Sequence, residues 1–243
     1  MTDLYLQVKM KPELSLNTIS EWDALINAEI DNLLAKDQES APGPDPFNTP
    51  AMKKAMLKAQ IKETLKLKEL SQYIQSALNI LVNDGKKCLD KDQFNALMET
   101  FSHAHEYLAK PAKNLENYQT ILHISDAQME AIAKIAIADF NQNQFADCLA
   151  VFILLTTLRP DIAGYWNRAG IAAQKAGIFD LAINFYNASL ELDSELMSSH
   201  LFLIDCYLSL KMFHEAQNQY AIAKSLSETQ EMDEASAVLF SKL

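Results

Sequence analysis

A 34-residue unit occurs three times between Met129 and Gln230, without insertion or deletion. Four columns of this unit keep the size and polarity of the side chain in every copy: Phe145, Phe179 and Phe213; Cys148, Ala182 and Ala216; Phe152, Tyr186 and Tyr220; Leu158, Leu192 and Leu226. A fixed period in this range indicates a repeat architecture, and 34 residues is the length of a helix–turn–helix unit. Since stacked helix hairpins form long concave surfaces, the pattern points to a binding protein.

The scarcity of turn residues supports an all-α fold. Only five glycines and seven prolines occur in 243 residues, which leaves little turn chemistry for a many-stranded sheet. The repeat region is expected to occupy residues 125–243, and Ser125 with Gln128 forms a capping box at its start. The first helix pair is predicted over Ser125–Asn141 and Phe145–Leu158. The second and third pairs are predicted to begin at Ala163 and Met197.

A last helix is expected to close the stack, because the final apolar face of a solenoid would otherwise meet water. Ser227 and Gln230 have the spacing of a second capping box. The apolar side of the helix that follows carries Met232, Ala235, Val238 and Leu239.

Three further regions precede the repeats. Residues 1–37 predict an amphipathic helix, in which Trp22, Leu25 and Ile26 are a possible homodimer contact. Residues 38–50 predict a proline-rich linker, with Phe47 as its only large apolar side chain. Residues 51–124 predict a helical extension.

The extension is predicted to hold two main helices. Thr49 and Pro50 open a long helix that ends at Asn83-Asp84-Gly85, and a second helix covers Asp90–Lys110. Between Lys53 and Lys68 the first carries six lysines against one glutamate. Such a basic amphipathic helix can lie on an anionic membrane, on nucleic acid or on an acidic protein surface, or it can simply be solvated.

Charge argues against nucleic acid as a partner. Most of the net charge of −11 falls on residues 115–243, which hold 16 acidic and 7 basic side chains, against 16 and 14 in residues 1–114. Phosphates would be repelled by such a region. No run of 18 apolar residues predicts a membrane span, no secretion signal is evident, and three widely spaced cysteines do not suggest a disulfide framework. We therefore expect a cytoplasmic protein without stable membrane insertion.

Enzymatic or metal chemistry is not indicated. His103 and His105 stand two residues apart, which places them on different faces of a helix, and no third ligand lies at a suitable spacing. The five glycines form no phosphate-binding loop, and neither an H-E-x-x-H nor a G-x-S-x-G motif occurs. We expect neither a cofactor nor a metal.

The second repeat resembles a tetratricopeptide motif, with Trp166, Gly170, Gly177, Phe179, Ala182 and Tyr186 at that family's spacing. The third repeat departs from it, with Ile204 and Lys211 where glycine is usual, which predicts looser helix packing there. Three repeats with an amphipathic N-terminal helix and a capping helix are similar to the class II chaperones of bacterial type III secretion. The segments Ala138–Gln142 and Phe179–Ile183 also resemble that family's first two repeats. The resemblance implies a tetratricopeptide solenoid that binds hydrophobic translocator proteins, and it favours a homodimer.

Repeat geometry places a candidate peptide-binding groove on the first helix of each hairpin, because these helices line the inner wall of the solenoid. The predicted groove residues are Ala133, Ile137, Phe140 and Asn141; Asn167, Ile171, Gln174 and Lys175; and Leu201, Asp205 and Leu208. Ala133 and Ile137 stand where repeats that bind a peptide's carboxylate carry basic or amide side chains. The predicted ligand is therefore an extended segment with apolar anchors.

Two functions fit these observations. The first is a cytoplasmic chaperone that holds a hydrophobic secreted client, of the translocator type or another export substrate, in an apolar groove. The second is a general tetratricopeptide adaptor that assembles a bacterial complex, with Lys53–Lys68 as a second docking site. A chaperone should be isolated with a secreted client, whereas an adaptor should be isolated with resident machinery.

Overall fold

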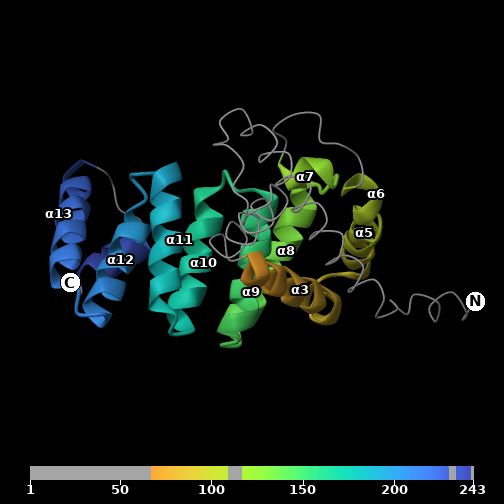
Figure 1. Ribbon diagram of the computed structural model, residues 1–243, viewed down its shortest axis with the longest axis horizontal. Helices are drawn as coiled ribbons and strands as arrows, with labels where there is room; N and C mark the ends of the chain where they lie inside the picture. Colours follow the sequence, from red (N-terminus) through yellow and green to blue (C-terminus); the bar gives the residue numbers. More distant parts are fainter. Residues whose placement is uncertain (1–66, 109–116, 230–233, 242–243) are drawn as a thin grey trace, which may run out of the picture. The chain divides into compact units, whose positions relative to one another are not determined.

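The computed structural model describes residues 67–108, 117–229 and 234–241, and every regular element in these ranges is an α-helix (Figure 1). The predicted N-terminal helix with Trp22, Leu25 and Ile26, the proline-rich linker and nearly all of the basic stretch lie outside the described residues. The chain divides into two units, residues 1–75 and 76–243, and the helices from α4 onward belong to the second.

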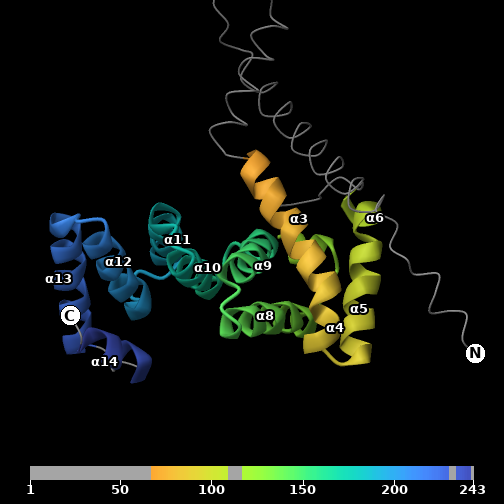
Figure 2. The same ribbon diagram turned by 90° about the horizontal axis from the view of Figure 1, so that it is seen from below.

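Helix pairs with short turns make up the repeat region. Before it come α3 (Leu67–Asn83), α4 (Gly85–Cys88), α5 (Lys91–Ser102), α6 (Ala104–Leu108) and α7 (Tyr118–Ile121). The repeats comprise α8 (Asp126–Asn141) with α9 (Phe145–Leu158), α10 (Ala163–Lys175) with α11 (Phe179–Leu192), and α12 (Met197–Ser209) with α13 (Phe213–Thr229). The three pairs follow one another in Figure 2, and each helix from α8 to α13 packs against the next. These boundaries agree with those predicted from the 34-residue period.

The capping helix α14 (Glu234–Phe240) closes the third repeat by packing against α12. Beneath it Met197, Leu201, Ile204, Ala216 and Ala223 form a buried cluster, onto which Leu239 and Phe240 pack. The predicted second capping box is wrong, since Ser227 lies inside α13 and its hydroxyl donates to the Lys224 carbonyl at 2.6 Å. A serine that bonds back to a carbonyl of its own helix continues that helix instead of opening another.

Two details of the extension also differ from the prediction. The long helix α3 ends at Asn83 as predicted, but Gly85 begins the further helix α4, and a Cβ there would lie 3.1 Å from the Phe94 ring. The helix predicted over Asp90–Lys110 is broken at His103, which ends α5. The His103 ring and the Ser102 hydroxyl both bond the Glu99 carbonyl, and such local side-chain bonds compete with the helical ladder.

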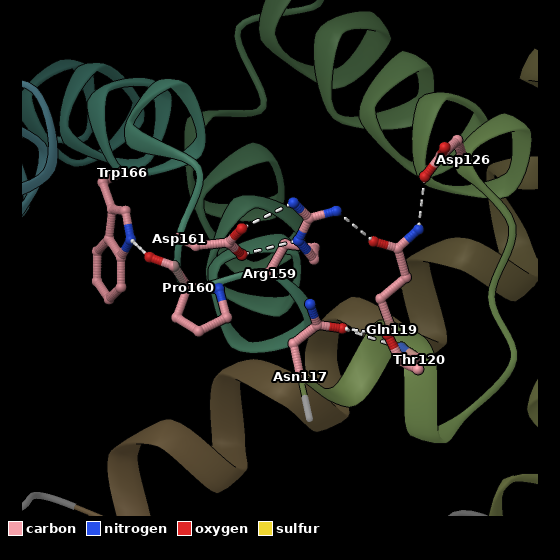
Figure 3. Close-up of polar contacts among 8 residues, drawn as sticks. All are labelled: Asn117, Gln119, Thr120, Asp126, Arg159, Pro160, Asp161 and Trp166. Carbon is pink, nitrogen blue, oxygen red and sulfur yellow. Dashed lines mark hydrogen bonds and ion pairs between the residues drawn. The ribbon is translucent and has the colours of Figure 1, made fainter. Parts of the chain in front are cut away.

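Side-chain hydrogen bonds join the extension to the first repeat. The predicted capping box of α8 is present, and Gln128 also donates to the Ala96 carbonyl at 2.9 Å and to the Thr100 hydroxyl at 2.8 Å, both on α5. Gln119 of α7 links the two ends of the first hairpin (Figure 3). Its side chain accepts a hydrogen bond from Arg159 at 2.9 Å and donates one to Asp126 at 2.8 Å. The start of the solenoid is thus fixed by long-range contacts.

Helix α9 is buried on all sides, unlike the corresponding helices of the other repeats. Ten of its 14 residues are buried, against three in α11 and two in α13. A helix that is apolar all round belongs in a protein interior. Its contacts include α7 as well as its solenoid neighbours α8 and α10, so the extension helps to cover the first repeat.

The turns between the paired helices share one strained position. Asn143, Gly177 and Lys211, spaced 34 residues apart, have φ angles of 60°, 79° and 60°. In this left-handed region a side chain with a Cβ costs about 1 kcal/mol, and only glycine escapes the clash. The third repeat therefore keeps the turn conformation of the second although it lacks the glycine.

Replacing Lys211 with glycine should stabilise the protein by about 0.5–1 kcal/mol, because the strain is removed while glycine's extra freedom in the unfolded chain offsets part of the gain. Urea unfolding measures the change. Asn143→Gly is the matched control and should give a smaller gain, since asparagine tolerates this conformation better than lysine. A loss of stability in Lys211→Gly would contradict the prediction.

Candidate functional site

The predicted groove residues differ widely in their exposure. Ile137 and Leu208 are each 44% exposed, and Asn141, Lys175 and Asp205 also face solvent. Phe140, Ile171 and Gln174 are half-buried, whereas Ala133, Asn167 and Leu201 are buried. All of them come from α8, α10 and α12, at equivalent positions of the repeat.

The accessible residues define the surface that we call the inner-wall surface. Its members are Ile137, Phe140, Asn141, Ile171, Gln174, Lys175, Asp205 and Leu208. Ile137 and Phe140 lie one helical turn apart near the end of α8, and the Phe140 ring packs edge-on against Phe145 at 5.3 Å. Apolar side chains that gather into one exposed patch mark a binding site, and Ile137, Phe140 and Ile171 are the candidates for such a patch here.

The buried members of the predicted groove stabilise the fold. Leu201 lies in the cluster beneath α14, because the capping helix packs onto α12. Asn167 donates to the Ser199 hydroxyl at 2.7 Å, which in turn lies 2.6 Å from the Ser189 hydroxyl. These bonds join the second repeat to the third across a buried interface, so the Asn167 amide nitrogen is already hydrogen-bonded within the protein.

A hydrogen-bond relay links the inner-wall surface to the core. The Tyr186 hydroxyl donates to Gln174 Oε1 at 2.7 Å, and Gln174 Nε2 donates to Asp205 Oδ2 at 2.5 Å. Tyr186 is fully buried, and burial raises the pKa of its hydroxyl, so it stays a protonated donor. The relay therefore holds Gln174 and Asp205 in fixed positions. The sequence suggested both surface residues but not their link to Tyr186.

The described residues outside this surface include few candidates for metal or thiol chemistry. No group of three or more His, Cys, Asp or Glu is placed to hold a metal in the part of the chain that the structure describes. Cys148 and Cys206 are buried, and burial raises the pKa of each thiol to about 12, which leaves both protonated and poorly nucleophilic. None of the described helices is both long and apolar enough to cross a bilayer.

Comparison with solved structures identifies the fold. A chain of the CopN–Scc3 complex matches with a TM-score of 0.50 and 19% identity, over 62% of this chain and 95% of that one. The type III secretion translocator chaperone SycD of Yersinia enterocolitica matches with a TM-score of 0.50 and 22% identity, over 54% and 98%. This chain therefore shares the all-α helical-repeat fold of SycD. No protein-family model and no curated protein matches the sequence.

Proposed function

We propose that this protein is a cytoplasmic type III secretion chaperone that binds an extended segment of a hydrophobic secreted client on the inner-wall surface. The observation that carries the proposal is the exposure of Ile137 and Leu208 at opposite ends of that surface, on a fold shared with a translocator chaperone. A client held there remains soluble until it is exported. The homodimer through Trp22, Leu25 and Ile26 stays a prediction.

The spacing of the helices suits an extended peptide. Packed helices lie about 8–10 Å apart, and an extended chain advances about 3.3 Å per residue. One client side chain in every three would therefore face the next of two helices that pack together, as α10 and α12 do. Each buried apolar anchor is worth about 1.5–3 kcal/mol before ordering costs, so a few anchors give a firm but reversible complex.

The test begins with a client isolated from the native cytoplasm with the wild-type protein. Its affinity is then measured by calorimetry for Ile137→Asp and Leu208→Asp. Each substitution should weaken binding by about 10–100-fold, because one anchor loses its apolar contact and meets a buried charge. Both side chains are exposed, so neither substitution should unfold the repeats.

Ile178→Asp is the matched control, since Ile178 is 42% exposed but lies at the start of α11, outside the inner-wall surface. It should bind the client as the wild type does. Unchanged binding in both groove variants would refute the proposed site. Isolation of resident secretion machinery in place of a secreted client would favour the adaptor function instead.

A further inference from the structure

The third repeat changes the chemistry of the inner-wall surface at one column. Ile137, Ile171 and Asp205 occupy equivalent positions, 34 residues apart, on α8, α10 and α12. Two apolar positions are thus followed by a carboxylate. A client segment that crosses the three helices in turn meets two apolar sites and then an acidic one.

The Asp205 carboxylate is held in place more firmly than an ordinary surface carboxylate. Gln174 Nε2 binds its Oδ2, and Gln174 is held in turn by the buried Tyr186 hydroxyl. Such support reduces the side-chain freedom that must be lost when a ligand binds. The exposed side chain keeps its second oxygen for another donor, since the described residues provide no hydrogen bond to Oδ1.

The charges around Asp205 leave it available to a cation from outside. Lys175, on the neighbouring helix α10, is exposed, and no ion pair joins it to Asp205 among the residues described. Residues 115–243 carry 16 acidic and 7 basic side chains, so the net field of the repeat region attracts positive charge. A lysine or arginine would form a charge-assisted hydrogen bond with the carboxylate, whereas a glutamate would be repelled.

We propose that Asp205 is a specificity-determining residue that selects a client segment with a lysine or arginine at the position facing the third repeat, next to the apolar anchors. This inference rests on the proposed function, because it assigns the chemistry of one site within the same surface. It defines the preferred client as an apolar segment with a basic residue at one end.

The probes are synthetic peptides, acetylated and amidated, in which two leucines three residues apart are followed three residues later by lysine, glutamate or glutamine. A second set has the reverse order, so that both chain directions are sampled. Binding is measured by fluorescence anisotropy with the full chain. The lysine peptide should bind about five- to tenfold more tightly than the glutamate peptide in low salt, and this ratio should shrink in 0.5 M salt.

Asp205→Asn keeps an oxygen for Gln174 and removes the charge, so it should bring the lysine-to-glutamate ratio close to one. Asp180→Asn is the matched control, because it removes an exposed carboxylate from the first turn of α11, outside the inner-wall surface. Its lysine-to-glutamate affinity ratio should equal that of the wild type. Equal affinity of the lysine and glutamate peptides in the wild type, with binding still lost in Ile137→Asp, would overturn this inference alone. Absence of binding, or binding insensitive to Ile137→Asp, would overturn it together with the proposed function.

Discussion

Replacing Gly170 with alanine should destabilise the repeats by about 2–3 kcal/mol, because the new methyl group has no room. A Cβ at this position would lie 2.5 Å from Cε1 and 2.7 Å from Cδ1 of Tyr186. The Tyr186 ring is fully buried, stacks on Phe202 at 5.6 Å and is tied to Gln174 through its hydroxyl. Since the ring cannot move aside without breaking these contacts, the substitution acts as overpacking of a filled core.

Thermal unfolding followed by circular dichroism measures the effect, with an expected fall in Tm of about 5–10 °C. Gly164→Ala is the matched control in the same helix, because a Cβ there meets nothing within 4 Å. Alanine favours a helix over glycine, so this control should raise the free energy of unfolding by up to about 1 kcal/mol. Equal effects of the two substitutions would show that close packing of Gly170 against Tyr186 does not matter.

The third repeat shows how the same contact changes when the glycine is absent. Ile204 takes the place of Gly170 and is buried, whereas Tyr220, which corresponds to Tyr186, is 38% exposed. The Tyr220 ring stacks instead on Phe240 of the capping helix, at 5.8 Å. In the last repeat the tyrosine thus packs against the capping helix, whereas Tyr186 packs against Phe202 of the following repeat.

The Gly170→Ala substitution should also affect the candidate site. Tyr186 positions Gln174, and Gln174 positions Asp205, so a displaced ring releases the relay. In Gly170→Ala the preference for lysine peptides should therefore weaken even at temperatures where the protein stays folded. Ile137, on another helix, should keep its contribution to client binding.

The helix order and boundaries of the repeats could be predicted because they depend on local sequence and on a period. Helix starts at Phe145, Ala163 and Met197 follow directly from the 34-residue spacing, and the capping box at Ser125 depends on residues three apart. The errors occur where a local pattern allows two outcomes. Ser227 could begin a helix or continue one, and only the neighbouring chain decides between them.

The sequence predicts where the candidate site would lie, but it does not predict how its side chains are buried or bonded. The period assigns a residue to the inner wall, yet its exposure depends on what packs over it, as Leu201 beneath α14 shows. The relay joins Tyr186 to Gln174 and Gln174 to Asp205, over separations of 12 and 31 residues. Because no local motif marks such pairs, the preorganised carboxylate becomes visible only in the folded chain.

Asp139 is expected to make the stability of the first repeat depend on pH. It lies in the last turn of α8 and is 1% exposed, and its Oδ2 has no hydrogen-bond partner among the described residues. Burial raises the pKa of its carboxyl from 3.8 to about 6, and the nearby carboxylates of Asp84 and Asp147 add to the rise. The positive charge of Lys87 lowers the pKa of Asp139, but Lys87 is itself bonded to Asp84.

The direction of the pH effect follows from the two pKa values. Between about pH 4 and pH 6 the folded chain holds the Asp139 proton, which the unfolded chain has released. The free energy of unfolding therefore falls as the pH rises through this range. Above pH 6 both states are ionised, and the loss reaches at most about 3 kcal/mol.

Asp139→Asn should remove this loss, because the amide has nearly the same shape and carries no charge. At pH 7.5 its Tm should exceed that of the wild type by about 5–10 °C, whereas at pH 3.5 the two proteins should differ little. Asp180→Asn is the matched control for an exposed aspartate and should change the free energy of unfolding by less than about 0.5 kcal/mol at either pH. A gain in Asp139→Asn that is the same at both pH values would mean that the substitution improves packing and that ionisation of Asp139 does not limit stability.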